Sequence, residues 1–384
     1  MRSQAQELCD RFGYPTELSE ILDEVVDLAR SHLGNVQSIV LSPSTSTGDF
    51  LWKRTDSGTH LLSDVDGFIF VEGAPRDLSG FREALNSLTR GVGGPEFHLD
   101  LSISSANTID RLPQTYQFVE TGLAGFVLSG KSPLERFPRK FDPRASRQAF
   151  LLNLFKPLRH EFLLASQGGL AQAAARLILD IPTLAASERG ECIAGHRGRA
   201  RWFLDERPGI LGTSPLITEA VEAAEAARQA PPGNLAVLRA IVYPAILEAA
   251  SLLDGRGPLH ENPGKETVMR LAAWLPPRSV RRVSGELRTA LQRPTHPTAD
   301  LRWLLNRKEA LAGAALLGVF GHLARGAAGT PPNGIGFCLL EFSRRPSTHL
   351  DSTKGDERGF IRSVCEVYSE GLLELYPSLG DASQ

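Results

Sequence analysis

The feature that most constrains the fold is a change of sequence pattern near Ser132. Before it, short apolar stretches bounded by Gly, Asp and Ser predict strands separated by helices. After it, apolar residues recur at helical spacing along nearly the whole remaining chain. At 384 residues the chain is also longer than one hydrophobic core usually serves. We therefore predict an α+β protein with a small mixed-sheet domain over residues 1–131 and a mostly α-helical domain over residues 132–384.

The first domain is predicted to open with an amphipathic helix that is capped by Thr16 and ended by Gly34. Strands are expected at residues 36–41 and 64–71, with a short helix at 78–89 between the second strand and the third. The clearest strand is 97–103, in which apolar and polar residues alternate strictly. This strand would turn one face toward the core and present His98, Asp100 and Ser102 on the other.

The second domain is predicted as a series of helices separated by proline-rich connectors. Ser214-Pro215 is a typical helix start, with a capping residue followed by proline at the first helical position. The predicted helices cover residues 147–155, 170–179, 215–228, 235–253, 299–323 and 358–375.

Charge and cysteine content exclude several classes of protein. Lys and Arg total 42 against 44 Asp and Glu, so the chain has no overall basic field that would favour nucleic acid. A local basic groove remains compatible with this balance. The four cysteines are scattered without a CxxC pair, which argues against a disulfide framework or a zinc site. Only seven of the cationic residues are Lys, a bias typical of GC-rich bacterial genomes.

The sequence also suggests where the protein resides. Residues 1–15 lack the apolar stretch of a signal peptide. The longest apolar run, residues 310–321, is shorter than the ~20 residues that cross a bilayer. We therefore expect a cytoplasmic protein with no membrane partner; its oligomeric state is not indicated by the sequence.

Acidic residues on the two later strands are the main functional signal. Asp64 and Asp66 stand two residues apart at the head of one strand, so both carboxylates project from the same face. Asp100 lies on the polar face of the strand at 97–103. If these strands are neighbours, three carboxylates converge with the hard oxygen ligands that suit Mg²⁺ or Mn²⁺.

A loop of small residues follows the first strand. It reads Pro43-Ser-Thr-Ser-Thr-Gly-Asp49 and supplies hydroxyl groups and exposed backbone N–H groups. A strand, a small-residue turn and a short helix are a typical arrangement for holding a phosphate.

In this order the motifs resemble those of the polymerase β-like nucleotidyltransferase superfamily. Its pattern is Gly-Ser-x-x-x-Gly, a spacer, an Asp-x-Asp that Ser often precedes, and a third carboxylate between apolar residues. The matching residues here are Ser44 and Gly48, then Ser63-Asp64-Val65-Asp66, then Leu99-Asp100-Leu101. Two departures are Pro43, where the family has its first Gly, and a longer spacer from Gly48 to Asp64. Pro43 removes a backbone N–H and adds bulk beside the phosphate.

The resemblance implies Mg²⁺-dependent transfer of a nucleoside monophosphate, most simply AMP from ATP, to a hydroxyl group, with release of pyrophosphate. Asp64, Asp66 and Asp100 would hold the metal ions. Asp100, near the attacking hydroxyl, would either act as a ligand alone or also accept the hydroxyl proton as a base. Ser44, Gly48 and Ser63 would bind the nucleotide. Lys53 and Arg54 either neutralise phosphate charge or are solvated loop cations.

The helical second domain and the segment Gly125–Gly130 are similar to those of aminoglycoside-type members, which implies a small-molecule acceptor. Three alternatives stay open: modification of tRNA or protein, synthesis of cyclic or oligonucleotides, and a non-catalytic nucleotide-binding module in which Pro43 marks a decayed loop. Arg197, Arg199 and Arg201 either line a phosphate cleft or form a solvated face.

Overall fold

The computed structural model describes residues 2–56, 58–92, 97–164, 167–227, 238–259, 265–276, 301–325, 361–362 and 365. The chain forms two compact units. Unit 1 comprises Met1–Pro143 and Ala186–Arg201, and unit 2 comprises Arg144–Ala185 and Trp202–Gln384. Each unit is described by itself. The α+β class, with a small mixed sheet and many helices, is confirmed.

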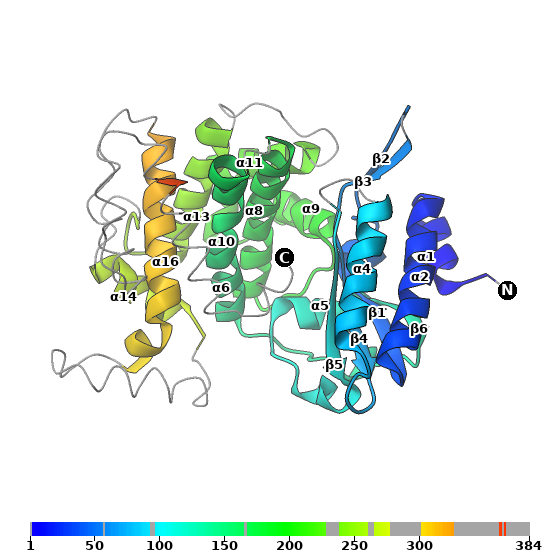
Figure 1. The fold of residues 1–384 in the computed structure, drawn as a ribbon. Helices are drawn as coiled ribbons and strands as arrows, with labels where there is room; N and C mark the ends of the chain where they lie inside the picture. The colour runs from blue at the N-terminus through cyan, green and yellow to red at the C-terminus, as the bar shows by residue number, and fades with distance from the viewer. Residues whose placement is uncertain are drawn as a thin grey trace. The chain divides into compact units, whose positions relative to one another are not determined.

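The sheet of unit 1 has four strands in the order β5-β4-β1-β6 (Figure 1). Its central strands β1 and β4 are antiparallel, β1 and β6 are antiparallel, and β4 and β5 are parallel. The mixed sheet therefore has β4 and β5 as neighbours, as the convergence of the carboxylates requires. The strands are β1 (Val36–Leu41), β4 (Val65–Val71), β5 (Leu99–Ser105) and β6 (Phe126–Gly130).

The predicted strands agree with the structure in position, with small shifts at their ends. The strand expected at 36–41 is β1, and the one expected at 64–71 is β4, which starts at Val65. The third begins at Leu99 rather than Phe97 because its ladder with β4 starts at the pair Val65 and Leu99. Phe97 is instead buried in the core just before the strand.

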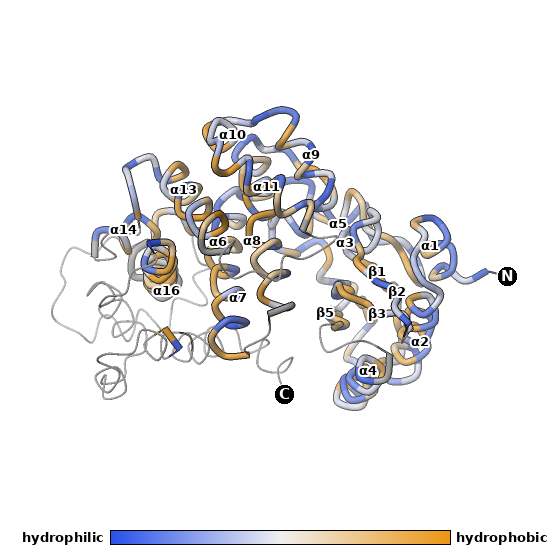
Figure 2. Tube along the Cα trace, turned by 90° about the horizontal axis from the view of Figure 1, so that it is seen from above, coloured by the Kyte–Doolittle hydropathy of each residue, from blue (hydrophilic) through white to orange (hydrophobic). Residues whose placement is uncertain are grey.

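One face of the sheet packs against α1 (Gln4–Phe12), α2 (Thr16–Leu33) and α4 (Leu78–Val92). Alternate residues of each strand point into this core, for example Ile39, Val65 and Ile69. In Figure 2 the helices α2 and α4 change between orange and blue along their turns, as expected of amphipathic helices.

The boundaries of α2 correct one detail of the prediction. Thr16 is the first helical residue, and the N-cap is Pro15, which has no side chain that can accept a hydrogen bond. Gly34 ends the helix as predicted, with φ of 85°. A Cβ there would lie 3.0 Å from the Arg76 side chain, so a larger residue would meet both backbone strain and a contact.

The opposite face of the sheet is covered only in part. Val40, Phe68 and Phe70 pack there against Phe137 and Ile109, next to α5 (Tyr116–Ala124) and the 3₁₀ turns η1 (Ala106–Arg111) and η2 (Leu134–Arg136). Toward the start of β4 and β5 the same face becomes polar. Asp66 precedes Phe68 by two residues, so it lies on this face.

The long spacer between Gly48 and Asp64 forms a β-hairpin, β2 (Trp52–Thr55) with β3 (Gly58–Leu61). Leu61 is buried in the core, and Trp52 packs against the same core. The extra residues therefore form a separate two-stranded element and leave the order of the flanking motifs unchanged.

The division of the chain differs from the predicted boundary at residue 131. Unit 1 continues to Pro143, and Ala186–Arg201 returns to it after the first helices of unit 2. Hydrogen bonds from this returning segment to Tyr116, Glu120 and Asp49 account for its assignment. These contacts join residues about 75 to 150 positions apart, which local sequence patterns do not indicate.

Unit 2 is helical, as predicted. The helix predicted at 235–253 is described from Leu238, where it has a π-helical turn, and most of the one predicted at 358–375 lies outside the described residues. No helix in the described ranges is long and apolar enough to cross a membrane. Its elements are α6 (Pro143–Asn153), α7 (Phe155–Leu158), η3 (Arg159–Leu163), α8 (Gln167–Glu188), α9 (His196–Glu206), α10 (Gly209–Gly212), α11 (Pro215–Ala227), η4 (Leu238–Val242), α13 (Tyr243–Asp254), α14 (Lys265–Trp274) and α16 (Leu301–Ala324), of which α6, α8 and α9 extend across the unit limits.

Candidate functional site

Three polar residues form a row across the sheet of unit 1. Asp66 on β4 is the register partner of Asp100 on β5. On the other side of β4, Leu41 pairs with Gly67, and the next residue, Ser42, donates its backbone N–H to the Asp66 carbonyl oxygen at 2.9 Å. Ser42, Asp66 and Asp100 therefore lie next to one another on three adjacent strands and on one face.

Gly67 keeps these strands close together. A Cβ at this position would lie 2.7 Å from the Val40 carbonyl oxygen and 3.0 Å from Leu101. Because backbone lies on one side and a core side chain on the other, only glycine fits without movement of the sheet. Packing thus requires glycine at the position that follows Asp66.

The third predicted carboxylate, Asp64, is not part of a strand. It precedes the first residue of β4 and is half-buried. Within the described part of the chain, no three His, Cys, Asp or Glu side chains are grouped closely enough to hold a metal ion. The metal-binding role of Asp64, Asp66 and Asp100 stays a prediction, with Asp66 and Asp100 brought together by the register.

The loop after β1 begins at Ser42 and forms the one-turn helix α3 (Pro43–Ser46). Pro43 occupies the first helical position, where its ring is accommodated and the missing N–H has no partner within the helix. Gly48 has φ of 83°, and a Cβ there would lie 3.2 Å from Phe12. The predicted glycine is therefore required by the backbone of the loop.

Hydroxyl groups of this loop are buried without hydrogen-bond partners. They belong to Ser42, Ser44 and Thr45. Ser42 is only 4 % exposed and Thr45 is fully buried. An unsatisfied buried hydroxyl usually costs free energy, on the order of 1–3 kcal/mol. Three of them lie within four residues, and Ser42 is next to Asp66, so this loop concentrates polar groups that the described structure leaves unsatisfied.

The rest of the loop is held firmly. The Tyr14 hydroxyl donates to the Thr45 carbonyl oxygen at 2.9 Å, and burial raises the pKa of Tyr14 to about 12, so the donor stays protonated. Ser46 donates to the carbonyl oxygen of Ala124 at the end of α5. Thr47 donates to the Pro43 carbonyl oxygen at 2.6 Å. Two hydrogen bonds to other elements and one within the loop thus hold its conformation.

Asp49 connects the end of the loop to the returning segment of unit 1. Its carboxylate accepts hydrogen bonds from the Thr47 hydroxyl at 3.2 Å and from the Arg197 backbone N–H at 3.3 Å. Gly195 makes this approach possible, because a Cβ there would lie 2.5 Å from Asp49 and 2.6 Å from Thr47. Sequence patterns did not single out Asp49 or Gly195.

A buried ion pair anchors the same segment. Arg199 pairs with Glu120 on α5, and their side chains are 5 % and 9 % exposed. The Arg199 guanidinium also lies 5.3 Å from the centre of the Tyr116 ring. Arg199, one of the arginines considered for a phosphate cleft, is therefore a buried structural residue of unit 1.

The other predicted ligand-binding residues have simpler surroundings. Ser63 accepts a hydrogen bond from the Leu51 N–H at 2.9 Å, which ties the start of the hairpin to the turn before β4. Lys53 and Arg54 are exposed on β2. Cys192 is not suited to be a nucleophile, because burial, and next the charge of Glu120, raises its pKa to about 11.

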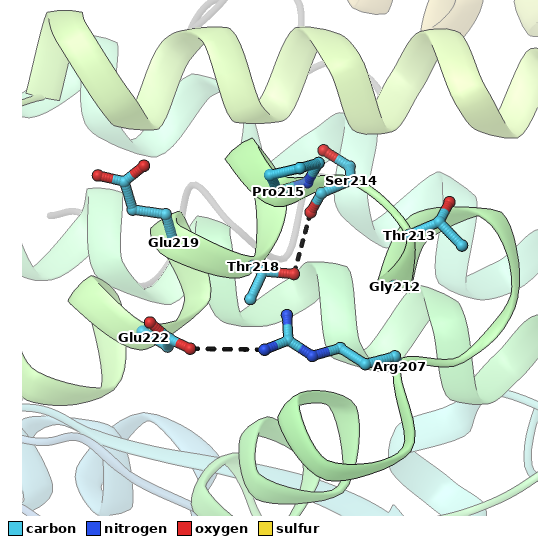
Figure 3. Close-up of a pocket in the computed structure, with 8 residues that line it drawn as sticks. All are labelled: Arg207, Gly212, Thr213, Ser214, Pro215, Thr218, Glu219 and Glu222. Atoms are coloured by element: carbon cyan, nitrogen blue, oxygen red, sulfur yellow. Dashed lines mark hydrogen bonds and ion pairs between the residues drawn. The ribbon is translucent and has the colours of Figure 1, made fainter.

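A hollow of about 400 Å³ lies in unit 2 between α10 and α11 (Figure 3). Several of its polar groups have partners: Thr218 donates to the Ser214 carbonyl oxygen at 3.0 Å, and Arg207 pairs with Glu222 at 3.7 Å. Because the hollow is open and several of its polar groups are already paired, it offers less for ligand recognition than the row in unit 1.

Sequence reasoning named Asp66, Asp100, Ser44 and Gly48 as candidate site residues and did not name Ser42 or Thr45, whose buried hydroxyl groups lie in the same region of the structure. The one sequence signal for Ser42 is its position directly after the strand predicted at residues 36–41. The antiparallel pairing of β1 and β4, which sets Ser42 next to Asp66, is not encoded in local spacing.

Comparisons with protein-family models, with curated proteins and with solved structures find no match to this chain, so its function is inferred from the residues themselves.

Proposed function

We propose that the protein is a Mg²⁺-dependent nucleotidyltransferase whose active site is the edge of the unit 1 sheet around Asp66, Asp100 and the loop Ser42–Asp49. The observation that carries the proposal is the register pairing of Asp66 with Asp100 directly beside a loop with unsatisfied buried hydroxyl groups. The motif order that resembles the polymerase β-like superfamily supports the same assignment.

The residues present are chemically suited to a hard divalent cation. Two carboxylates on adjacent parallel strands lie about 5 Å apart at the backbone, and a cation between them would offset their mutual repulsion. Oxygen ligands of this kind are those that Mg²⁺ and Mn²⁺ prefer. Mg²⁺ bound there would supply Lewis-acid polarisation of the α-phosphate and neutralise charge on the leaving pyrophosphate.

The remaining roles fall to side chains of the chain itself. Asp66 and Asp100 would act as metal ligands, and Asp100, the more exposed of the two, would also accept the proton of the acceptor hydroxyl. Asp64, at the head of the strand, would join them as the third carboxylate. Ser44 and Thr45 would donate to phosphate oxygens, and the rigid support of the loop would keep these donors in place before the nucleotide binds.

For the donor and acceptor we propose an NTP, most simply ATP, and a hydroxyl group on a small molecule. The near-neutral charge of the chain supports a small acceptor over a nucleic acid, because phosphate backbones are bound through clustered Lys and Arg. The helical second unit, which follows the sheet unit as in aminoglycoside-type enzymes, supports the same choice.

Product formation tests this proposal. The purified full-length protein is incubated with one NTP at a time, Mg²⁺ and a pool of polyhydroxylated small molecules. We expect pyrophosphate release and, by mass spectrometry, a product whose mass has increased by one nucleoside monophosphate. A reaction without an acceptor would indicate a cyclic or oligonucleotide synthase instead. Absence of pyrophosphate with every NTP and pool would contradict the proposed transfer.

A further inference from the structure

The row across the sheet contains one more oxygen atom than the carboxylate pattern predicts, the hydroxyl of Ser42. Ser42 caps the one-turn helix α3 by position, but its side chain makes no capping hydrogen bond. The hydroxyl oxygen is buried without a partner, and the residue is 4 % exposed. The local structure therefore gives this hydroxyl no role of its own.

The orientation of Ser42 follows from the alternation along β1. Ile39 and Leu41 belong to the core under α1, α2 and α4, whereas Val40 belongs to the cluster on the opposite face with Phe68 and Phe70. Ser42 continues the series of Val40, so it lies on the face of Asp66 and Asp100. Its backbone hydrogen bond to Asp66 confirms that the two residues are adjacent.

The three positions fit a single cation. Neighbouring strands are about 4.8 Å apart, so a cation above Asp66 is within one strand spacing of both Ser42 and Asp100. A Ser or Thr hydroxyl at the start of the helix that follows a phosphate loop is an established Mg²⁺ ligand, and Ser42 is the N-cap residue of α3. Burial of the Ser42 hydroxyl removes solvent as an alternative partner.

We propose that Ser42 is a direct oxygen ligand of the divalent cation held by Asp66 and Asp100. This inference rests on the proposed function and adds to it a ligand that the carboxylate motif does not contain. The bound cation would be the partner that the buried Ser42 hydroxyl lacks in the structure. The neutral Ser42 oxygen would add one ligand to the cation without adding a third negative charge to the row.

Binding of Mn²⁺ alone to the full chain, followed by titration calorimetry and by the electron paramagnetic resonance of free Mn²⁺, tests the inference. The variants are Ser42→Ala, Asp66→Asn as the variant that removes the site, and Ser44→Ala as the matched control. Ser44 lies two residues further on and also has a buried hydroxyl without a partner. We expect Ser42→Ala to weaken Mn²⁺ binding at least tenfold and Ser44→Ala to leave it within about twofold of the wild type.

Thermal melting without metal separates a ligand role from a folding role. Removing a buried hydroxyl that has no partner should leave the melting temperature of Ser42→Ala equal to that of the wild type or above it. A second variant, Ser42→Cys, should shift preference from Mn²⁺ toward Cd²⁺ at least tenfold relative to the wild type, because thiolate sulfur is a soft ligand.

The outcomes distinguish the two proposals. If the wild type binds Mn²⁺ and Asp66→Asn does not, while Ser42→Ala binds like the wild type, the cation site stands and the role of Ser42 is refuted. If the wild type binds no Mn²⁺, or Asp66→Asn binds as tightly, both the cation site and the Ser42 ligand are refuted.

Discussion

The Asp66→Asn variant is expected to lower the rate of nucleotidyl transfer about a thousandfold or more. The substitution keeps the size of the side chain but removes the negative charge at the centre of the row formed by Ser42, Asp66 and Asp100. Loss of metal-dependent charge stabilisation costs several kcal/mol in the transition state, and each ~1.4 kcal/mol is a factor of ten in rate. Initial rates of pyrophosphate release by the two proteins at equal concentration measure the effect.

The matched control is Asp56→Asn, an exposed aspartate in the turn of the β2–β3 hairpin. This variant removes the same charge from the same unit, but Asp56 belongs to the two-stranded sheet and not to the sheet that carries the row. We expect its rate to stay within twofold of the wild type. An Asp66→Asn protein that melts normally and retains more than a tenth of the wild-type rate would contradict the proposed role of Asp66.

The second large effect is expected on stability, from the buried ion pair between Glu120 and Arg199. Changing Glu120 to Gln leaves the Arg199 guanidinium buried without its counter-charge. It also weakens the acceptor for the Gly195 N–H, which Glu120 binds at 2.7 Å. Breaking one partner of a buried pair typically costs about 3–5 kcal/mol. Denaturant unfolding, followed by hydrogen exchange of the α5 backbone, measures the loss.

An exposed ion pair of unit 1 provides the comparison. Arg136 and Asp110 also form a charged hydrogen bond, at 2.6 Å, but their side chains are 45 % and 62 % exposed. Asp110→Asn should therefore change the free energy of unfolding far less than Glu120→Gln does, because solvent screens this exposed pair. In the double variant Glu120→Gln/Arg199→Met no buried charge is left unpaired, so part of the loss should be recovered. If Glu120→Gln and Asp110→Asn lowered the free energy of unfolding equally, burial would not be the reason that the Glu120–Arg199 pair stabilises the protein.

The elements that could be predicted are those specified by local periodicity. β1, β4, α2 and α4 appear in the structure close to their predicted limits, because the strands are short runs of buried apolar residues and the helices carry an apolar stripe at helical spacing. The strand expected from residue 97 was also found, beginning two residues later where its ladder with β4 starts. The hairpin β2–β3 was missed, since its short strands mix Lys, Arg, Thr and His with few apolar residues.

The candidate site was predicted in part for the same reason. Asp66 and Asp100 stand out because each interrupts an apolar strand at a regular position. The contributions of Ser42, Asp49 and Gly195 depend on strand pairing and on a segment that returns to unit 1 after an intervening stretch of unit 2. Contacts of this kind are set by tertiary packing, and one sequence without homologues does not indicate them.

The most direct test of the central claim is a thermal-shift measurement with each NTP, in the presence and absence of Mg²⁺, on the wild type and Asp66→Asn. A ligand at a hundred times its dissociation constant stabilises the native state by about 2.7 kcal/mol, which raises the melting temperature by a few degrees. We predict a Mg²⁺-dependent shift with at least one NTP that the Asp66→Asn variant lacks. Absence of a shift with all NTPs, or an equal shift in Asp66→Asn, would contradict a nucleotide site at Asp66.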